Sequence, residues 1–461
     1  MAPSIDPVRR KKVLKVIVIS LLLDLISFTF ILPLFPRLLE YYRDVEASSP
    51  IAADGSATLL QTTFGYLNRY KEAFERKIDS RYDIVLLGGA LGSLFSLLQA
   101  IASPLIGTLS DRYGRRTALL LSMSGNILSV LLWVMAVDFR TFVLSRVVGG
   151  LSEGNVQLAT AMATDISDDE SRGSTMAMIG ACFSIAFTFG PMLGAYLSSI
   201  PTVAQNPFAT AAGVSLFLIV TETIYLYFCL PETLPSLAGR DGDAKATGGA
   251  EKSEDDQKQE EPTRRTNSHF LLNATHFVFL LFFSGMESSL SFMTYDLFAF
   301  TSSNNGRLLG FIGLVASILQ GGVTRRLPPL LAVRIGVVAC LAAFALLARL
   351  QTVSMLYVAA AFLAMTSSTV VTGLNSLSSF EAGARERGGK LGMMRSWGQL
   401  GRGLGPVLFT SVYWWAGREV AYKLGATGMA VVAVAVFAGL KTPARTEGAQ
   451  GKKGGVEKKE L

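Results

Sequence analysis

Long apolar runs dominate the pattern along the chain, and most of them are long enough to cross a membrane. The clearest runs are 84–107, 117–137 and 352–376, none of which contains a charged residue. Because a helix of about 20 mainly apolar residues spans the hydrocarbon core of a bilayer, each run predicts a membrane-spanning helix. Nine more runs predict the other spans: 14–36, 142–163, 174–199, 208–230, 271–299, 307–323, 331–350, 391–415 and 420–440.

The polar stretches between these runs divide the chain into parts. The run 14–36 follows the basic stretch Arg9 to Lys12 and is too long for a cleavable signal peptide, so we expect it to be the first span. Segment 236–269 holds fourteen charges and too few apolar residues to fold alone. The predicted parts are an N-terminal tail 1–13, a six-helix half 14–235 with a long outer loop 37–83, a charged linker 236–269, a second six-helix half 270–440 and a basic tail 441–461.

The distribution of basic residues predicts the orientation of the chain. With both chain ends in the cytoplasm, most of the 42 Lys and Arg residues lie on the cytoplasmic side, as positive residues do in membrane proteins. The pattern does not distinguish the plasma membrane from an internal one. Within the outer loop, apolar residues from Leu59 to Phe74 recur at helical spacing and predict an amphipathic helix that packs against the outer surface, with a lid over the outer mouth as the alternative.

Composition narrows the class further. Charged residues make up 17% of the chain, against about 25% in soluble domains, and the +7 net charge comes from short basic runs between apolar ones. This distribution argues against nucleic-acid binding, which needs basic residues clustered on one soluble face. The three cysteines all lie in apolar runs and predict no disulfide framework, and we expect neither a metal site nor a cofactor. No phosphate-binding loop of the form G-x-x-x-x-G-K-[ST] is present, so any transport would depend on an ion gradient or on facilitation, and we do not expect an enzyme.

The two predicted halves repeat each other. Arg172 precedes Pro191 by 19 residues, and Arg387 precedes Pro406 by 19 residues. Each proline follows a glycine, at Gly190 and Gly405. Two six-helix halves in parallel repeat are the plan of one large transporter fold.

A short loop between the second and third spans carries the most specific motif of the chain. We expect a tight turn at Gly114, Asp111 facing a helix N-terminus, and arginines that pair with acids. The loop matches the G-x-x-x-D-R-x-G-R-R signature of the major facilitator superfamily, and the resemblance implies a latch that stabilises the cytoplasm-closed state. The alternative is simple anchoring on the cytoplasmic side by the arginines. The motif residues are Gly107, Asp111, Arg112, Gly114, Arg115 and Arg116.

The fifth span resembles the antiporter signature of the same superfamily, a glycine-rich helix that ends in G-P-x-x-G. Its residues are Gly180, Gly190, Pro191 and Gly194, and the pair Gly405 and Pro406 repeats the pattern in the eleventh span. Small residues allow helices to approach closely, and proline loosens one helical turn. A hinge and plain tight packing are both open interpretations.

Acidic residues inside the spans are the candidates for proton coupling. Asp24 falls at the middle of the first span, where a charged carboxylate is costly unless it is neutral, paired or in water. An Asp nine residues before P-x-x-P (Pro33 to Pro36) resembles the first helix of tetracycline antiporters. Asp24 is therefore either a proton carrier or a hydrogen-bonding residue that positions the helix. Glu153 and Glu287 are the other candidates.

The fourth span carries a polar stripe. Arg146, Glu153, Gln157 and Thr160 lie at offsets of 7, 11 and 14 residues, which predicts one face of a continuous helix lining a substrate cavity. Leu144 to Gly150 also resembles the fourth-helix signature of the superfamily, whose arginine is implicated in proton transfer. The alternative is an internal pair of Arg146 with Glu153 or Asp24 that has no transport role.

The second half offers Asp296 and Arg402 as further cavity candidates. We expect Arg402 to pair with Glu287 or Asp296 at rest, with substrate competing for its guanidinium group. His276 is expected at the membrane interface, and Glu222 in the sixth span receives no role.

Nearly the full length resembles the eukaryotic tetracycline-transporter-like family, whose members are regarded as organic-anion transporters. The third and ninth spans lack the acids of tetracycline antiporters, which argues against tetracycline itself. We therefore expect a monomeric, proton-coupled carrier of a small organic anion or drug-like solute, with protons and membrane lipid as its other partners. The alternatives are a facilitative uniporter and a receptor or scaffold that moves nothing. The resemblance rests on Leu22 to Leu25, Arg81-Tyr82, Gly154 to Val156, Phe187 to Ala195, Leu230 to Pro235 and Phe283 to Glu287.

Overall fold

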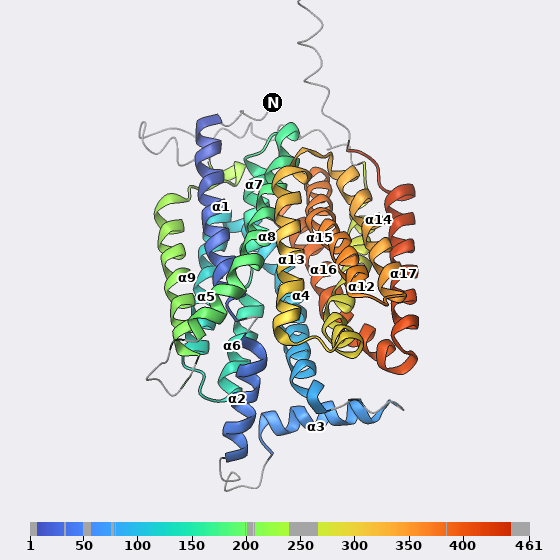
Figure 1. The fold of residues 1–461 in the computed structure, drawn as a ribbon. Coiled ribbons are helices and arrows are strands. Elements are labelled where there is room, and N and C mark those ends of the chain that lie inside the picture. Colours follow the sequence, from blue (N-terminus) through green and yellow to red (C-terminus); the bar gives the residue numbers. More distant parts are fainter. Residues whose placement is uncertain are drawn as a thin grey trace, which may run out of the picture.

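A computed structural model describes ten stretches of the chain as a bundle of helices lying side by side (Figure 1). Much of the predicted linker, most of the basic tail and the first six residues lie outside the described residues. The described stretches are 7–31, 34–48, 57–74, 78, 80–198, 200, 206, 208–238, 266–383 and 385–443.

Helices form the regular elements throughout the described stretches. In the first half they are α1 (Pro7–Thr29), α2 (Phe35–Ser48), α3 (Leu59–Glu72), η2 (Ser80–Tyr82), α4 (Asp83–Tyr113), α5 (Arg115–Val134), α6 (Phe139–Ser152), α7 (Asn155–Asp165), α8 (Asp169–Ser198), α9 (Ala209–Cys229) and α10 (Pro235–Ala238). In the second half they are α12 (His269–Phe298), α13 (Ser302–Gly322), η3 (Thr324–Arg326), α14 (Pro329–Ala348), α15 (Val353–Glu381), α16 (Arg387–Ala416), α17 (Arg418–Val434) and η4 (Ala435–Gly439).

Nine helical segments within the described part of the chain are long and apolar enough to cross a membrane. They contain α4, α5, α8, α9, α12 to α15 and α17 with η4, so the prediction of a multi-pass helical membrane protein is confirmed. The other three predicted spans fall on α1 and α16, which carry several charges, and on the interrupted pair α6 and α7. The count of twelve spans stays a prediction.

The predicted span 14–36 ends earlier than expected. α1 stops at Thr29 and a separate helix, α2, begins at Phe35. The sequence explains the interruption, because Pro33 disfavours a helical conformation at the residue before it. α2 occupies part of the predicted loop and is held in place by its apolar face: Leu38 and Leu39 are fully buried, and the Tyr42 hydroxyl donates to the carbonyl of Ala136 at 3.0 Å.

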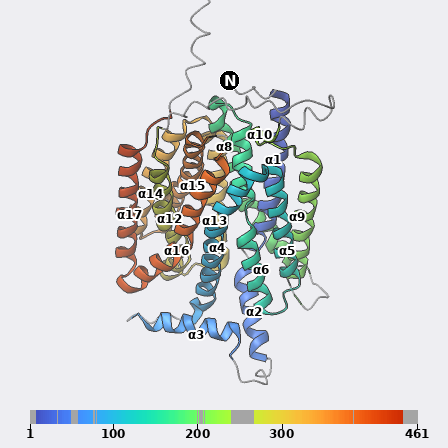
Figure 2. The same cartoon turned by 180° about the vertical axis from the view of Figure 1, so that it is seen from behind.

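The amphipathic helix predicted in the outer loop is present as α3, which lies across one end of the bundle (Figures 1 and 2). It starts with a capping box, in which Thr58 and Gln61 satisfy each other's backbone N–H groups. Its far end reaches the second half, where the hydroxyl groups of Tyr70 and Ser411 lie 2.9 Å apart. We call this the loop end of the bundle, and the opposite end, where α1 and α16 begin, the terminal end.

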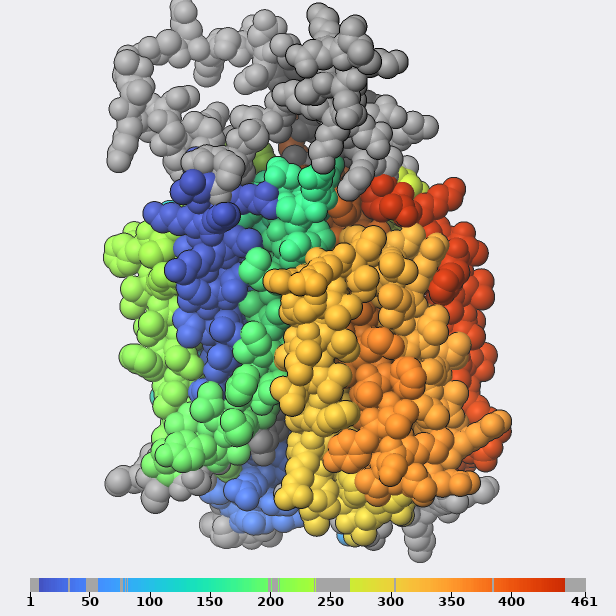
Figure 3. Space-filling model, turned by 45° about the horizontal axis from the view of Figure 1, so that its top comes forward, coloured from blue at the N-terminus to red at the C-terminus, as the bar shows by residue number. Residues whose placement is uncertain are grey.

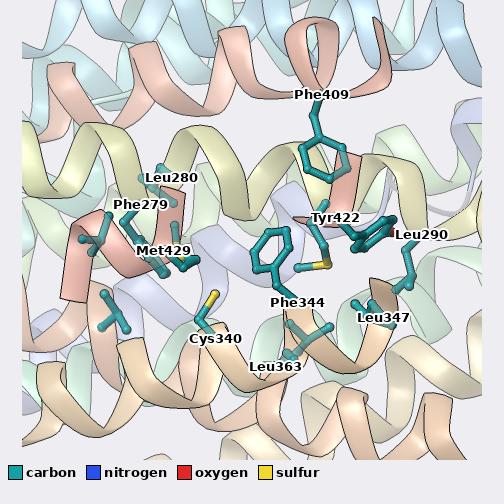
Figure 4. Close-up of a cluster of buried hydrophobic side chains, with 14 of the residues drawn as sticks. Phe279, Leu280, Leu290, Cys340, Phe344, Leu347, Leu363, Phe409, Tyr422 and Met429 are labelled. Carbon is teal, nitrogen blue, oxygen red and sulfur yellow. The ribbon is translucent and has the colours of Figure 1, made fainter. Parts of the chain in front are cut away.

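Each half has its own apolar core. In the second half, the rings of Phe344, Phe409 and Tyr422 pack together with centroids 5.4 to 6.2 Å apart (Figure 4). The buried Tyr422 hydroxyl forms a hydrogen bond with the Ser289 hydroxyl at 2.9 Å, so this core leaves that polar group satisfied.

The halves meet along two seams, α4 against α16 and α8 against α13 and α15. Figure 3 shows α8 running beside α13 at the boundary between the halves. Glycines let the backbones approach: a side chain on Gly392 would collide with the carbonyl of Ser103, and one on Gly313 would collide with Thr188. The seams place α16 directly against the polar residues of the first half.

Candidate functional site

Charged groups fasten the two halves together at the terminal end. Asp111, at the end of α4, accepts the backbone N–H groups of Gly388 and Gly389 at 2.9 and 2.6 Å, in the first turn of α16. Asp165, at the end of α7, accepts Arg387 of α16 at 3.0 Å. A carboxylate at a helix N-terminus gains from both the free N–H groups and the helix dipole. We call this set of contacts the terminal gate.

Arg115 connects the gate to the first half. Its guanidinium group is fully buried and donates to Asp111 at 2.6 Å and to Asp165 at 2.9 Å. Asp165 thus bridges arginines of both halves, and it was not among the predicted site residues. Gly107 lies in the same contact, where an added Cβ would collide with the carbonyl of Gly388.

The rest of the motif shapes the turn between α4 and α5. Gly114 has φ of 102°, a conformation that favours glycine. The carboxylate of Glu232, beyond α9, accepts the backbone N–H groups of Arg115 and Arg116 at 2.9 and 3.2 Å and so caps α5. The Arg116 guanidinium donates to the Tyr227 carbonyl at 2.6 Å, whereas Arg112 is exposed.

A buried polar cluster lies inside the first half. Asp24 of α1 is 2% exposed, and one of its carboxylate oxygens has no hydrogen-bond partner among the described residues. A cavity of about 30 Å³, lined in part by Asp24, Ser27, Asn126, Arg146 and Glu153, adjoins it. This volume suits a few water molecules and not an organic solute.

Arg146 and Glu153 of the fourth span, whose pairing was the alternative interpretation, form no ion pair with each other among the described residues. The Arg146 guanidinium stacks on the rings of Phe142 and Phe95, at 5.6 and 5.9 Å from their centroids. Glu153 instead accepts a long hydrogen bond of 3.5 Å from the Asn126 amide. Both charged groups are buried, with 7% and 8% of their surfaces exposed.

The continuous helical face predicted for the fourth span is wrong, because the helix breaks beside Glu153. α6 ends at Ser152 and α7 begins at Asn155. The Ser122 hydroxyl of α5 closes the gap by donating to the Ser152 carbonyl at 2.5 Å and accepting from the Gly154 N–H at 2.9 Å. Buried backbone groups need such partners, so a distant side chain makes the break tolerable.

The two polar residues beyond the break are buried and bonded within the first half. The Gln157 amide donates to the Ser103 carbonyl of α4 at 2.9 Å. The Thr160 hydroxyl donates to the Val156 carbonyl of its own helix at 2.7 Å. Neither bond requires a substrate.

Sequence reasoning missed Arg395 of α16, although it lies within the predicted span 391–415, two turns before Arg402. The neighbouring Ser396 hydroxyl donates to the Ala100 carbonyl of α4 at 2.6 Å, which fixes this turn of α16 against the first half. The charge of Arg395 acts on Glu153 and Asp24, and its buried Nε has no partner among the described residues.

The ion pairs expected in the second half do not form within the described residues. Asp296 accepts hydrogen bonds from the hydroxyl groups of Tyr82 and Tyr413, at 2.6 and 3.4 Å, and not from Arg402. Glu287 is exposed on α12. Neutral donors from η2 and α16 have taken the place of the guanidinium group, so Asp296 helps to tie the halves together at the loop end.

His276 is buried, contrary to the expectation of an interfacial side chain. Its Nδ1 lies 3.1 Å from the carbonyl of Met394, and its ring packs over Gly398, where any side chain would collide with it. The ring therefore contributes to the contact between α12 and α16. Among the residues that the structure describes, no group of three or more His, Cys, Asp or Glu side chains is arranged to hold a metal ion.

Comparison with known protein families identifies the family of this chain. A family model described as Major Facilitator Superfamily matches residues 17–406. The chain belongs to the major facilitator superfamily. Members of this superfamily are transporters, and the all-helical fold of this chain is theirs.

Several relatives within the superfamily are similar over most of the chain. Major facilitator superfamily domain-containing protein 10 of Mus musculus is 33% identical over 95% of both chains, and its Homo sapiens counterpart is 32% identical over 95% of this chain and 94% of its own. A crystal structure of the human organic anion transporter MFSD10 (TETRAN) has a TM-score of 0.80 at 31% identity, covering 94% of this chain and 100% of that one. Tetracycline resistance protein, class B, of Escherichia coli is 25% identical over 73% of this chain and 82% of its own.

The glycines of the superfamily's antiporter signature lie at close helix contacts. Beside α8, an added Cβ would collide with the side chains of Gln320 and Thr372 at Gly180, with Thr29 at Gly190 and with the Phe30 backbone at Gly194. Gly405 of α16 faces the carbonyl of Leu281 in the same way. Pro191 and Pro406 lie inside these two helices. The contacts support tight packing, and a hinge at the prolines stays a prediction.

Proposed function

We propose that this chain is a secondary transporter that couples the movement of a small organic anion to protons by alternating access. In this proposal it works as a monomer with its terminal end in the cytoplasm. Membership of the superfamily, the multi-pass fold and the similarity to a human organic anion transporter support the transport of a small solute.

The observation that carries proton coupling is the buried carboxyl group of Asp24. It has an oxygen without a partner among the described residues and lies beside a cavity of water size. A buried carboxylate without direct pairing is costly, so the site favours the protonated acid and releases a proton only when water or a cation reaches it. Such a group can change its charge during a transport cycle.

The charges around Asp24 and Glu153 favour an organic anion as the solute. Two guanidinium groups, on Arg146 and Arg395, lie within the spans near the acids Asp24 and Glu153. Protonation of Asp24 leaves an excess of positive charge there. A guanidinium group presents paired donors that match a carboxylate, so an anionic solute can replace the lost negative charge.

Coupling arises because protons and solute act on the same equilibrium, between a state closed to the cytoplasm and a state open to it. The terminal gate favours the state that is closed to the cytoplasm, and opening requires the contacts at Asp111 and Asp165 to break. A ligand shifts such an equilibrium only by its difference in affinity for the two states. A change of charge at Asp24 alters the attraction between the first half and Arg395 of the second half. Protonation would therefore change the relative stability of the closed and open states.

Transport into proteoliposomes tests this function. Purified protein is reconstituted, and uptake of a radiolabelled aryl carboxylate is measured with a pH gradient of each polarity and without one, with the corresponding uncharged amide as the control solute. We expect protein-dependent uptake of the carboxylate that one polarity accelerates. Uptake that ignores the gradient would indicate a uniporter, and no uptake of any solute would indicate a receptor or scaffold.

A further inference from the structure

Glu222 is a second buried acid of the first half, on the peripheral helix α9. It is 1% exposed, and its Oε2 has no hydrogen-bond partner among the described residues. A carboxylate in this position loses most of its hydration and has no cation bonded to it among the described residues, so a negative charge on Glu222 is costly.

The contact between α1 and α9 fixes the position of Glu222 relative to Asp24. The hydroxyl groups of Ser27 and Ser215 lie 2.6 Å apart and join the two antiparallel helices. Asp24 lies one turn from Ser27 towards the terminal end, and Glu222 lies two turns from Ser215 in the same direction. With a rise of 1.5 Å per residue, Glu222 is about 6 Å nearer the terminal end than Asp24.

The charges around Glu222 are mainly acidic. Asp24 and Glu153 are the charged groups that act on it. The cations of the neighbouring helices lie near the terminal end, where Arg116 donates to the Tyr227 carbonyl at 2.6 Å. The helices packed against α9 carry Arg9, Arg10, Lys11, Lys12, Lys15 and Asp24 on α1, Arg115 and Arg116 on α5, and Asp169, Glu170, Arg172, Cys182 and Tyr196 on α8, while α9 itself carries Tyr225, Tyr227 and Cys229.

The water-sized cavity adjoins Asp24 on the side of the loop end, whereas Glu222 lies on the side of the terminal end. Asp24 and Ser215 line it, and so does Ile219, one turn of α9 before Glu222. Its polar lining residues and its volume of about 30 Å³ suit water, which can bring a proton to Asp24. The residues that line this space all belong to the first half.

We propose that Glu222 is a proton-relay site that connects Asp24 to the terminal end through the first half alone. The proposal rests on the proposed function. Glu222 loses its proton to water on the cytoplasmic side, the carboxylate that forms takes the proton of Asp24, and Asp24 regains a proton from the cavity water. Only O–H bonds break and form, and until Asp24 regains a proton its charge is free to attract Arg395. Protons thus reach the cytoplasm while the terminal gate keeps the solute path closed.

A substitution that keeps the shape of Glu222 tests this relay. Glu222→Gln mimics the neutral acid but cannot release a proton, and Glu170→Gln, at an exposed position of α8, is the matched control. We expect pH-driven uptake by the Glu222→Gln protein to fall by roughly tenfold to a hundredfold, the scale of losing one positioned proton carrier. Exchange of labelled for unlabelled anion without a gradient should stay within about twofold of the unmodified protein, because it needs no net proton movement.

The outcomes separate this proposal from the function on which it rests. Equal pH-driven uptake by the Glu222→Gln and Glu170→Gln proteins would overturn the relay and leave proton coupling intact. If the unmodified protein ignores the pH gradient, both proposals fall.

Carbodiimide labelling decides the case if Glu222→Gln does not fold. Dicyclohexylcarbodiimide reacts with protonated carboxyl groups in apolar surroundings, so mass spectrometry of the unmodified protein should find Glu222 labelled at acidic pH, and less so as the pH rises. A Glu222 that stays unlabelled while Asp24 reacts would overturn the proposal.

Discussion

Arg395 of the second half places a positive charge near the acids of the first half. Its turn of α16 is fixed against α4 by the Ser396 hydroxyl, and its guanidinium group acts on Glu153 and Asp24 across the boundary between the halves. Its Nε has no partner among the described residues, so under the proposed function Arg395 is the side chain that would contact the anion.

Substitution of Arg395 should therefore weaken anion binding more than it disturbs the fold. For Arg395→Gln we expect the KM for the aryl carboxylate to rise by roughly tenfold to a hundredfold, since a hydrogen bond between charged groups contributes about 1.5–3 kcal/mol. Arg395→Lys keeps the charge and loses the paired donors, so its KM should lie between those of the other two proteins. A KM that stays unchanged in Arg395→Gln would exclude direct contact with the solute.

The polar clusters also explain which site residues the sequence could reveal. Asp24, Arg146 and Glu153 stand out because charge within an apolar run is rare, and Arg395 could have been found by the same rule. Asp165 could not, because it lies at a helix end and its importance comes from arginines of two different halves. The partners of Asp296 were equally hidden, since Tyr82 lies more than 200 residues away in the chain.

At the scale of the element, the N-terminus of α16 is the movable part of the terminal gate. Two of its backbone N–H groups are satisfied by Asp111 of the other half, and water would replace the carboxylate if the halves separated. The gate is therefore an electrostatic contact that can open without disrupting either core.

Removing the charge of Asp111 should favour the open gate. We expect Asp111→Asn to shift the equilibrium by about 1–2 kcal/mol, or roughly 5- to 30-fold, because the charge–dipole term and one hydrogen bond are lost. Double electron–electron resonance between spin labels at positions 113 and 393, in a Cys229→Ser background, measures the separation of α4 and α16. Long distances should become more populated, and the distribution of a Glu170→Gln control should not change. Identical distributions would show that Asp111 does not hold the gate.

Two elements show where hydrophobic patterning fails. The break between α6 and α7 contains no proline, and it is tolerated only because Ser122 of another helix satisfies the freed backbone groups. Most of α2 falls in the predicted outer loop 37–83, yet its buried face packs on the first half. Both depend on contacts far along the chain, which no local pattern contains.

At the scale of the whole molecule, the two halves are fastened at both ends by different chemistry. The terminal gate uses carboxylates, arginines and a helix N-terminus, whereas the loop end uses the hydroxyl groups of Tyr70 and Tyr82. The long apolar runs and the repeated Arg-to-Pro spacing predict such a pair of helical halves, because they reflect burial and repetition along the chain. The contacts between the halves follow only from the three-dimensional arrangement.

Asp24 is the group on which the proposed coupling of protons to solute most directly depends. Its central test compares the unmodified protein with Asp24→Asn in the same proteoliposomes, measuring both anion exchange without a gradient and uptake driven by a pH gradient. Asparagine resembles the protonated acid, so exchange should stay within about threefold of the unmodified rate while stimulation by the gradient disappears. Full stimulation by the pH gradient in the Asp24→Asn protein would contradict the account.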